Sequence, residues 1–197
     1  VRGNFDDAQT GVKTLFGDTQ LAQELSAKGW FLSSANSINW GRLLPQIVYY
    51  FSAYCDFINS NGLKLGDEVD FAVPTGNFGD ILACWYAKQM GLPVGKLICA
   101  SNENNVLADF FKTGTYDRNR AFHTTISPSM DILVSSNLER LLYSVCGDDK
   151  QVAEYMRSLS EKGSYTVSNE IFKVLSDNFV GGFCTDADTK ATIANVY

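Results

Sequence analysis

Apolar positions recur at helical spacing in several segments of this chain and form short continuous runs in others. The longest stripe runs from Trp40 to Ile58, and its three-and-four spacing predicts a helix whose start is trimmed by Pro45. Shorter helices are predicted over Phe5 to Phe16, with Asn4 as a possible cap, over Asp80 to Met90, where Gly91 and Pro93 end the helix, and over Asn105 to Lys112. Continuous apolar runs predict strands over Trp30 to Ala35, Val69 to Val73 and Lys96 to Ala100.

These elements follow one another in the order β, α, β, α, β, α. Strands that alternate with helices of this length predict parallel pairing through right-handed crossovers. The expected fold class is therefore α/β, a parallel sheet flanked by helices with a helical extension, and ligands are expected at the carboxyl ends of the strands.

Beyond Gly114 the pattern changes. Residues Thr115 to Thr125 are expected to form a loop, and Tyr165 to Leu175 is ambiguous. Helices are expected over Asn137 to Cys146, Asp148 to Glu161 and Thr185 to Tyr197, the last beginning in a capping box with Asp in place of Glu.

Composition and charge favour a small-molecule ligand. The 197 residues are 45% hydrophobic and carry a net charge of −6, with basic residues scattered rather than grouped, which argues against a nucleic-acid surface. No run is apolar for long enough to span a bilayer. The five cysteines are odd in number and widely spaced, which is typical of reduced thiols in a cytoplasmic protein and gives no metal-ligand spacing.

The segment Gly76-Asn77-Phe78-Gly79 lies between a predicted strand and a predicted helix. Its backbone amides and the helix N-terminus can converge on one anion, with Asn77 as the non-glycine residue best suited to a left-handed conformation. The segment lacks the lysine of a nucleoside-triphosphate loop and the three glycines of a dinucleotide loop, so a monoester phosphate fits best. Asp80 must then turn its carboxylate away from that phosphate. The alternative is a plain strand-to-helix turn in which the glycines serve only geometry.

Four ungapped stretches together resemble the threonine synthase family, pyridoxal-phosphate enzymes of fold type II. They read NSINWGRLLPQIVYYF, PTGNFGDILACWYAKQMGLPVGKL, ASNENNVLADFFKTGTY and ISPSMDILVSSNLERLLY, and the opening GNFDDAQ is similar to the same family. The resemblance implies that the cofactor phosphate is bound by Gly76, Asn77, Phe78, Gly79 and Asp80. It also implies a substrate region that holds Asn36, Ser37, Asn39, Asn102, Asn104, Ser127 and Asp131.

The implied reaction converts O-phospho-L-homoserine and water to L-threonine and phosphate. The family binds its cofactor through a lysine, yet none of the ten lysines lies in that family motif. We therefore expect a central fragment of a threonine synthase, inactive by itself, with no catalytic residue of its own. Residues 1–36 are expected to be the tail of a small domain and residues 37–197 an incomplete part of the large cofactor-binding domain, whose exposed sheet edges favour self-association.

Two other functions remain open at this stage. A related phospho-lyase would share these motifs and release 2-oxobutyrate, and a non-catalytic interaction module could keep the same fold. His123 is interpreted as a structural or solvent-facing residue, since no partner stands at motif spacing. The aromatic residues of the long helix are interpreted as core. They are Trp40, Tyr49, Tyr50, Phe51, Tyr54 and Phe57.

Overall fold

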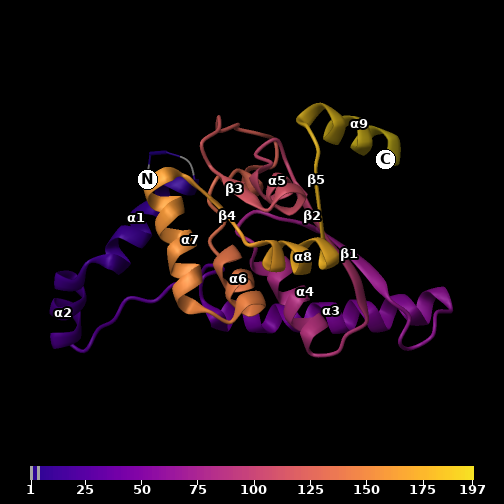
Figure 1. The fold of residues 1–197 in the computed structure, drawn as a ribbon, viewed down its shortest axis with the longest axis horizontal. Coiled ribbons are helices and arrows are strands. Elements are labelled where there is room, and N and C mark those ends of the chain that lie inside the picture. The colour runs from indigo at the N-terminus through magenta and orange to yellow at the C-terminus, as the bar shows by residue number, and fades with distance from the viewer. Residues whose placement is uncertain (1, 4) are drawn as a thin grey trace.

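The computed structural model describes residues 2–3 and 5–197 of the chain and shows an α/β fold (Figure 1). Its main sheet has the strand order β1-β2-β5, and both strand pairs are parallel. The strands are β1 (Val69–Pro74), β2 (Val94–Ser101) and β5 (Phe179–Phe183). The parallel pairing of β1 with β2 confirms the expected fold class. A second, antiparallel pair consists of β3 (Thr115–Asp117) and β4 (Ser164–Thr166).

Helices surround the main sheet, and two groups of them reach outward. In Figure 1, α1 and α2 extend at one end of the molecule and α9 extends near the other, while α3 and α4 pack against each other below the strands. The helical elements are α1 (Phe5–Gly17), α2 (Thr19–Ala27), α3 (Trp40–Asn61), α4 (Gly79–Gln89), α5 (Val106–Thr113), the 3-10 turn η1 (Pro128–Met130), α6 (Leu138–Cys146), α7 (Asp149–Lys162), α8 (Asn169–Asn178) and α9 (Asp186–Val196).

Aromatic rings fill the centre of the core. Phe111 stacks on Phe179 at 4.8 Å between ring centroids, and Phe78 stacks on Phe111 at 5.9 Å. Tyr116 and Tyr165 stack at 5.4 Å, joining the small antiparallel pair to the same core. Buried rings of this size stabilise the fold through the apolar area that they bury and through the geometry of their contacts, so the ring of Phe78 anchors its loop to the core.

The expected strand over Trp30 to Ala35 is wrong. This segment has no regular structure, and the side chains of Trp30 and Phe31 are 69% and 85% exposed. Its apolar run has no pairing partner among the described residues. The third strand of the main sheet is instead β5, whose two glycines give it a low local propensity for strand.

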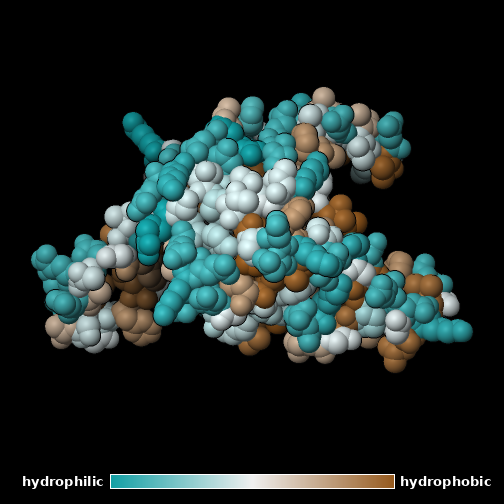
Figure 2. Space-filling view, in the orientation of Figure 1, coloured by the Kyte–Doolittle hydropathy of each residue, from teal (hydrophilic) through white to brown (hydrophobic). Residues whose placement is uncertain are grey.

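Helix α3 begins at Trp40 as expected, but its apolar surface is wider than the face that packs. Tyr50 and Tyr54 are buried, whereas Leu44, Val48 and Tyr49 are more than half exposed. The core interpretation is therefore wrong for the outward-facing aromatics, Trp40, Tyr49 and Phe57. Figure 2 shows patches of apolar surface along the lower side, where α3 runs. Pro45 lies inside the helix and does not mark its start.

Local signals near helix ends are more reliable. Thr185 and Asp188 form the expected capping box at the start of α9, and Asp148 caps α7. Gly91 follows Met90, the C-cap of α4, with a φ of 101°, and its amide donates to the carbonyl of Lys88, so it ends the helix as expected. The ambiguous segment near residue 165 contains β4 and α8, and the expected loop after Gly114 begins with β3. The expected cap at Asn4 lies outside the described residues.

Candidate functional site

A cavity of about 530 Å³ lies at the carboxyl end of β1. Three stretches of the chain line it: residues 36–46, the loop and helix start at 74–81, and Pro128 with Ser129 of η1. Carboxyl ends of parallel strands are the usual ligand position in such sheets. The structure thus brings the predicted loop residues into one cavity with Asn36 and Ser37.

The backbone amides of the loop are free of protein acceptors in the described residues, whereas two of its carbonyls accept hydrogen bonds from other segments. Within the described residues, the backbone amides of 76–81 donate to no protein acceptor. The carbonyl of Gly76 accepts a hydrogen bond from Ser135 Oγ at 2.9 Å, and the carbonyl of Asn77 accepts from Nδ2 of Asn137 at 2.8 Å. Because the C=O and the following N–H of a peptide unit point in opposite directions, these bonds turn the next amides away from residues 135–137. Together with the start of α4, these amides are donors of the kind that can bind an anion.

The left-handed residue of the loop is Phe78, with a φ of 66°, and the prediction for Asn77 is wrong. Phe78 is 1% exposed and its ring packs on Phe111. Burial of the ring offsets the backbone strain, which costs on the order of 1 kcal/mol for a non-glycine residue. Local propensity favours asparagine at such a position, but it takes no account of the ring stack.

The two glycines of the loop allow close packing. A Cβ atom on Gly76 would lie 2.7 Å from the carbonyl oxygen of Ser129, and one on Gly79 would lie 3.0 Å from Cβ of Ser37. Neither glycine has a positive φ. Their function is therefore to let η1 and the segment around Ser37 approach the loop.

Asp80 is held by Tyr50 of α3. The Tyr50 hydroxyl lies 3.0 Å from Oδ1 of Asp80 and 3.1 Å from its carbonyl oxygen, and donates toward both. Burial, followed by the charge of Asp80, raises the pKa of Tyr50 well above its usual range, so the phenol keeps its proton and remains a donor. One carboxylate oxygen at the start of α4 is thereby fixed by a neutral partner.

The segment 36–39 forms a second wall of the cavity. Asn36 and Ser37 line it, and Oδ1 of Asn36 accepts a hydrogen bond from the amide of Ile38 at 3.1 Å. Asn39 instead caps α3 by accepting from the amide of Gly41 at 2.8 Å. Arg42 also lines the cavity and donates to the carbonyl of Ala35 at 2.9 Å, which places a positive charge on this wall.

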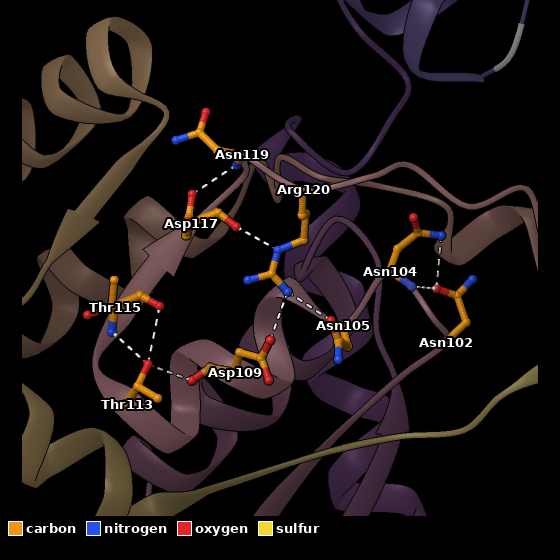
Figure 3. A network of polar contacts seen from close by, with 9 residues as sticks. All are labelled: Asn102, Asn104, Asn105, Asp109, Thr113, Thr115, Asp117, Asn119 and Arg120. Carbon is orange, nitrogen blue, oxygen red and sulfur yellow. Dashed lines mark hydrogen bonds and ion pairs between the residues drawn. The ribbon is translucent and has the colours of Figure 1, made fainter.

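Asn102, Asn104 and Asp131 lie together in a buried network beside η1. Asn102 Nδ2 donates to Oδ1 of Asp131 at 2.7 Å, and Thr125 donates to the same carboxylate from its hydroxyl at 2.8 Å and its amide at 3.1 Å. The side chain of Asn104 turns toward Asn102 (Figure 3), donating to Oδ1 of Asn102 at 3.2 Å. The carbonyl of Ser127 accepts from Asn102 at 3.4 Å. These predicted site residues thus bind one another and fix the turn that forms the third wall.

A neighbouring network ties β3 to α5. Arg120 donates from its guanidinium to Asn105 and to Asp109, both at 2.8 Å, and to the carbonyl of Asp117 (Figure 3). The Arg120 to Asp109 ion pair is about one-third exposed, so its role is to hold the loop before residue 125 in place rather than to stabilise strongly. His123 lies in that loop with an exposed side chain, and its backbone amide donates to Asn104 at 2.9 Å.

Other reactive groups are poor candidates for catalysis. Burial raises the pKa of the Cys84 thiol to about 12 and that of the Cys99 thiol to about 12, so both stay protonated at neutral pH. In the described part of the chain, no three His, Cys, Asp or Glu side chains are arranged to hold a metal ion, and no helix is long and apolar enough to cross a bilayer. No lysine is among the residues that line the cavity, all of which the structure describes.

Sequence reasoning missed the residues that orient the loop. Ser135 and Asn137 reach it from a distant part of the chain, as does Tyr50. Asn137 lies at the start of a predicted helix, where an asparagine is typical of a helix cap, yet its side chain makes no capping bond. Only the resemblance covering residues 126–143 signals that this segment belongs to the site.

Comparison with known proteins identifies relatives along the whole chain. Threonine synthase-like 1 from Homo sapiens is 46% identical over 200 residues, which cover 100% of this chain and 27% of that protein. Threonine synthase from Saccharomyces cerevisiae is 41% identical over 207 residues, covering 100% of this chain and 39% of that protein. The crystal structure of PLP-bound threonine synthase from Brucella melitensis matches with a TM-score of 0.83 at 43% identity, covering 99% of this chain and 40% of that one.

This chain is of the threonine synthase type. Its α/β fold is the fold of these enzymes, as the yeast threonine synthase structure also shows with a TM-score of 0.82 at 37% identity over 99% of this chain and 38% of that one. A comparison with models of protein families found no match. The threonine synthase-type chain spans between 27% and 41% of the length of the curated relatives it matches.

Proposed function

We propose that this chain forms the cofactor-phosphate part of a pyridoxal-phosphate-dependent threonine synthase. The observation that carries the proposal is the loop at 76–81, whose amides have no protein acceptor in the described residues and adjoin a cavity while its carbonyls at 76 and 77 are bound elsewhere. The relative from Brucella melitensis binds the same cofactor. The proposed reaction of the whole protein converts O-phospho-L-homoserine and water to L-threonine and phosphate.

The residues present fit a monoester phosphate. Such a group carries two negative charges on a compact set of oxygens, which matches several amides at one helix start. The Arg42 guanidinium on the adjoining wall contributes the positive charge that the loop itself lacks. Gly76 and Gly79 allow the walls to close around the loop, so the group would be enclosed on three sides.

Pyridoxal phosphate supplies, when bound, an electron sink for carbanion chemistry at the substrate. The chain's own residues would bind the cofactor phosphate and orient the substrate. We propose the amides of 76–81 as the phosphate ligands, and Asn36 and Ser37 as substrate contacts because they line the same cavity. Asn39, Asn102, Asn104, Ser127 and Asp131 are proposed to shape the walls, since the structure ties them to other protein groups.

We further propose that the chain does not turn over by itself. The reaction requires a base that moves protons at the substrate, and in this family a lysine serves. Since none lines the cavity in the described residues, that lysine would come from polypeptide outside these 197 residues. We keep the proposed division at residue 36, with residues 1–36 as part of a small domain and residues 37–197 as part of the large one.

The proposed location is the cytoplasm, because Cys55, Cys84, Cys99, Cys146 and Cys184 are all free thiols. The proposed partners are the small-molecule substrate and a second copy of the chain. Self-association would use the outer strands of the main sheet, β1 and β5, since unpaired strand edges pair readily with other chains.

Binding of pyridoxal 5′-phosphate and of pyridoxal to the chain, measured by calorimetry, tests the phosphate site. We expect pyridoxal 5′-phosphate to bind at least tenfold more tightly, a difference of about 1.4 kcal/mol. Equal binding of the two would contradict the site. In a longer polypeptide that contains this chain, O-phospho-L-homoserine should yield L-threonine and phosphate; release of 2-oxobutyrate without threonine would contradict the reaction and favour a phospho-lyase.

A further inference from the structure

We propose that Asn137 and Arg140 are positioning residues that hold the phosphate loop and the segment 36–39 in a fixed relation across the cavity. The inference rests on the proposed function, because it concerns how the same loop binds phosphate. It assigns a role to Asn137, which directly precedes α6, and to Arg140 of α6, neither of which lines the cavity itself.

Asn137 is fully buried, and its side chain binds the loop. It is 0% exposed, and both its backbone amide, at 3.1 Å, and its Nδ2, at 2.8 Å, donate to the carbonyl oxygen of Asn77. Two donors on one carbonyl fix the plane of the peptide that joins Asn77 to Phe78. The amide of Phe78 belongs to that peptide and therefore points away from Asn137.

Asn137 occupies the N-cap position of α6 but does not cap the helix with its side chain. It precedes α6 directly, where an asparagine side chain commonly caps the helix by accepting an amide hydrogen bond. No such bond forms here. The Nδ2 atom instead donates to the loop carbonyl of Asn77, and Oδ1 accepts a hydrogen bond from Arg140 at 2.8 Å, so neither polar atom of the side chain caps the helix.

Arg140 continues the connection to the second wall. One guanidinium nitrogen donates to Asn137 Oδ1, and the other donates to the carbonyl of Ile38 at 2.6 Å. The path Asn77, Asn137, Arg140, Ile38 thus joins two segments that are close to 40 positions apart in the sequence. The planar fork of arginine fixes both bonds in one geometry, which a lysine cannot reproduce.

The test compares Asn137→Asp with the parent chain. Aspartate keeps the size and the acceptor for Arg140, but it cannot donate to the carbonyl of Asn77. We expect the ratio of affinities for pyridoxal 5′-phosphate and pyridoxal to fall about tenfold or more, while pyridoxal binding stays within about twofold. Asn178→Asp is the matched control, because Asn178 Nδ2 also donates to a carbonyl, that of Val174 at 2.8 Å, on an exposed part of α8.

Arg140→Lys tests the connection between the walls. In amide NMR spectra of the parent, inorganic phosphate should shift the signals of both Phe78 and Ser37. In the variant we expect the Phe78 shift to remain and the Ser37 shift to shrink at least threefold. A Ser37 response equal to that of the parent would overturn the connection.

The outcomes separate the two proposals. Equal affinity of the parent for both compounds would overturn the proposed function. A parent that prefers the phosphate, with an Asn137→Asp variant of the same preference, would overturn the positioning role alone. Should that variant fail to fold, Arg140→Lys provides the second measurement, because it acts on the same connection, and a Ser37 response equal to that of the parent would then overturn the inference.

Discussion

The carbonyl oxygen of Ser129 lies only 2.7 Å from the place where a Cβ atom on Gly76 would stand. The loop at 76–81 and η1 are therefore in backbone contact, and neither can move independently of the other. The packing of the loop between η1 on one side and residues 135–137 on the other explains why its conformation is set by long-range contacts.

Gly76→Ala should force η1 and the loop apart, because backbone atoms cannot yield as a flexible side chain does. We expect a loss of about 1–3 kcal/mol in the free energy of unfolding and at least a tenfold loss of pyridoxal 5′-phosphate affinity. Gly79→Ala should cost less, since its Cβ would meet Ser37 at 3.0 Å. Chemical denaturation and calorimetry measure both quantities. Gly11→Ala is the control, because nothing lies within 4 Å of that position, and an equal loss there would refute the steric explanation.

Asp131→Asn should weaken the wall that η1 forms. The carboxylate of Asp131 is buried and accepts from Asn102, Asn104 and Thr125, so an amide group would place a donor against donors. We expect a loss of about 2–4 kcal/mol in the free energy of unfolding. Urea denaturation checks this value. Asp177→Asn on the surface should change stability little, and a similar loss in both variants would contradict the importance of burial.

Stability should fall at alkaline pH. Burial raises the pKa values of Cys84 and Cys99 from about 9 to about 12, so the unfolded chain releases these protons first. The contribution is fully present below pH 9 and is lost as the pH rises toward 12, with each thiol adding about 1.4 kcal/mol per pH unit to the slope. Denaturation curves at pH 8 to 11 measure this slope. Cys99→Val should lower the slope of unfolding free energy against pH by about 1.4 kcal/mol per pH unit, the contribution of one proton, and an unchanged slope would refute the assignment.

Self-association should depend on the outer strand β5. Val180 is 45% exposed on this strand, and a lysine there should oppose pairing of the edge with another copy. We expect Val180→Lys to raise the dimer dissociation constant about tenfold or more, measured by sedimentation velocity. Val174→Lys, at a similarly exposed valine on α8, is the control. Equal effects of the two substitutions would point to general charge repulsion instead.

The sequence predicted features that depend on neighbouring residues. The loop after β1, the capping box at Thr185 and the helix end at Gly91 each involve residues a few positions apart. The strand β5 escaped prediction because Gly181 and Gly182 lower its local propensity, and its pairing with β2 supplies what the local sequence lacks. The segment after Trp30 shows the reverse, an apolar run without a partner strand in the described residues.

The candidate site was predicted in part for the same reason. Glycines beside a strand end predict an anion-binding loop by local rules, but the donors that orient it come from residues 135–137, about 60 positions later. Likewise, the left-handed residue is Phe78 because its ring fits among Phe111 and Phe179, which no local preference reveals. Hydrogen bonds and ring stacks between distant segments decide both details.

The buried ring of Phe78 has a kinetic consequence. Because the ring is locked in the core, the backbone of the loop is already in its strained conformation before any phosphate arrives. A ligand therefore need not wait for the loop to order, and stopped-flow traces should show a single phase whose rate rises linearly with ligand concentration and reaches no plateau. Capture of the phosphate is then limited by encounter.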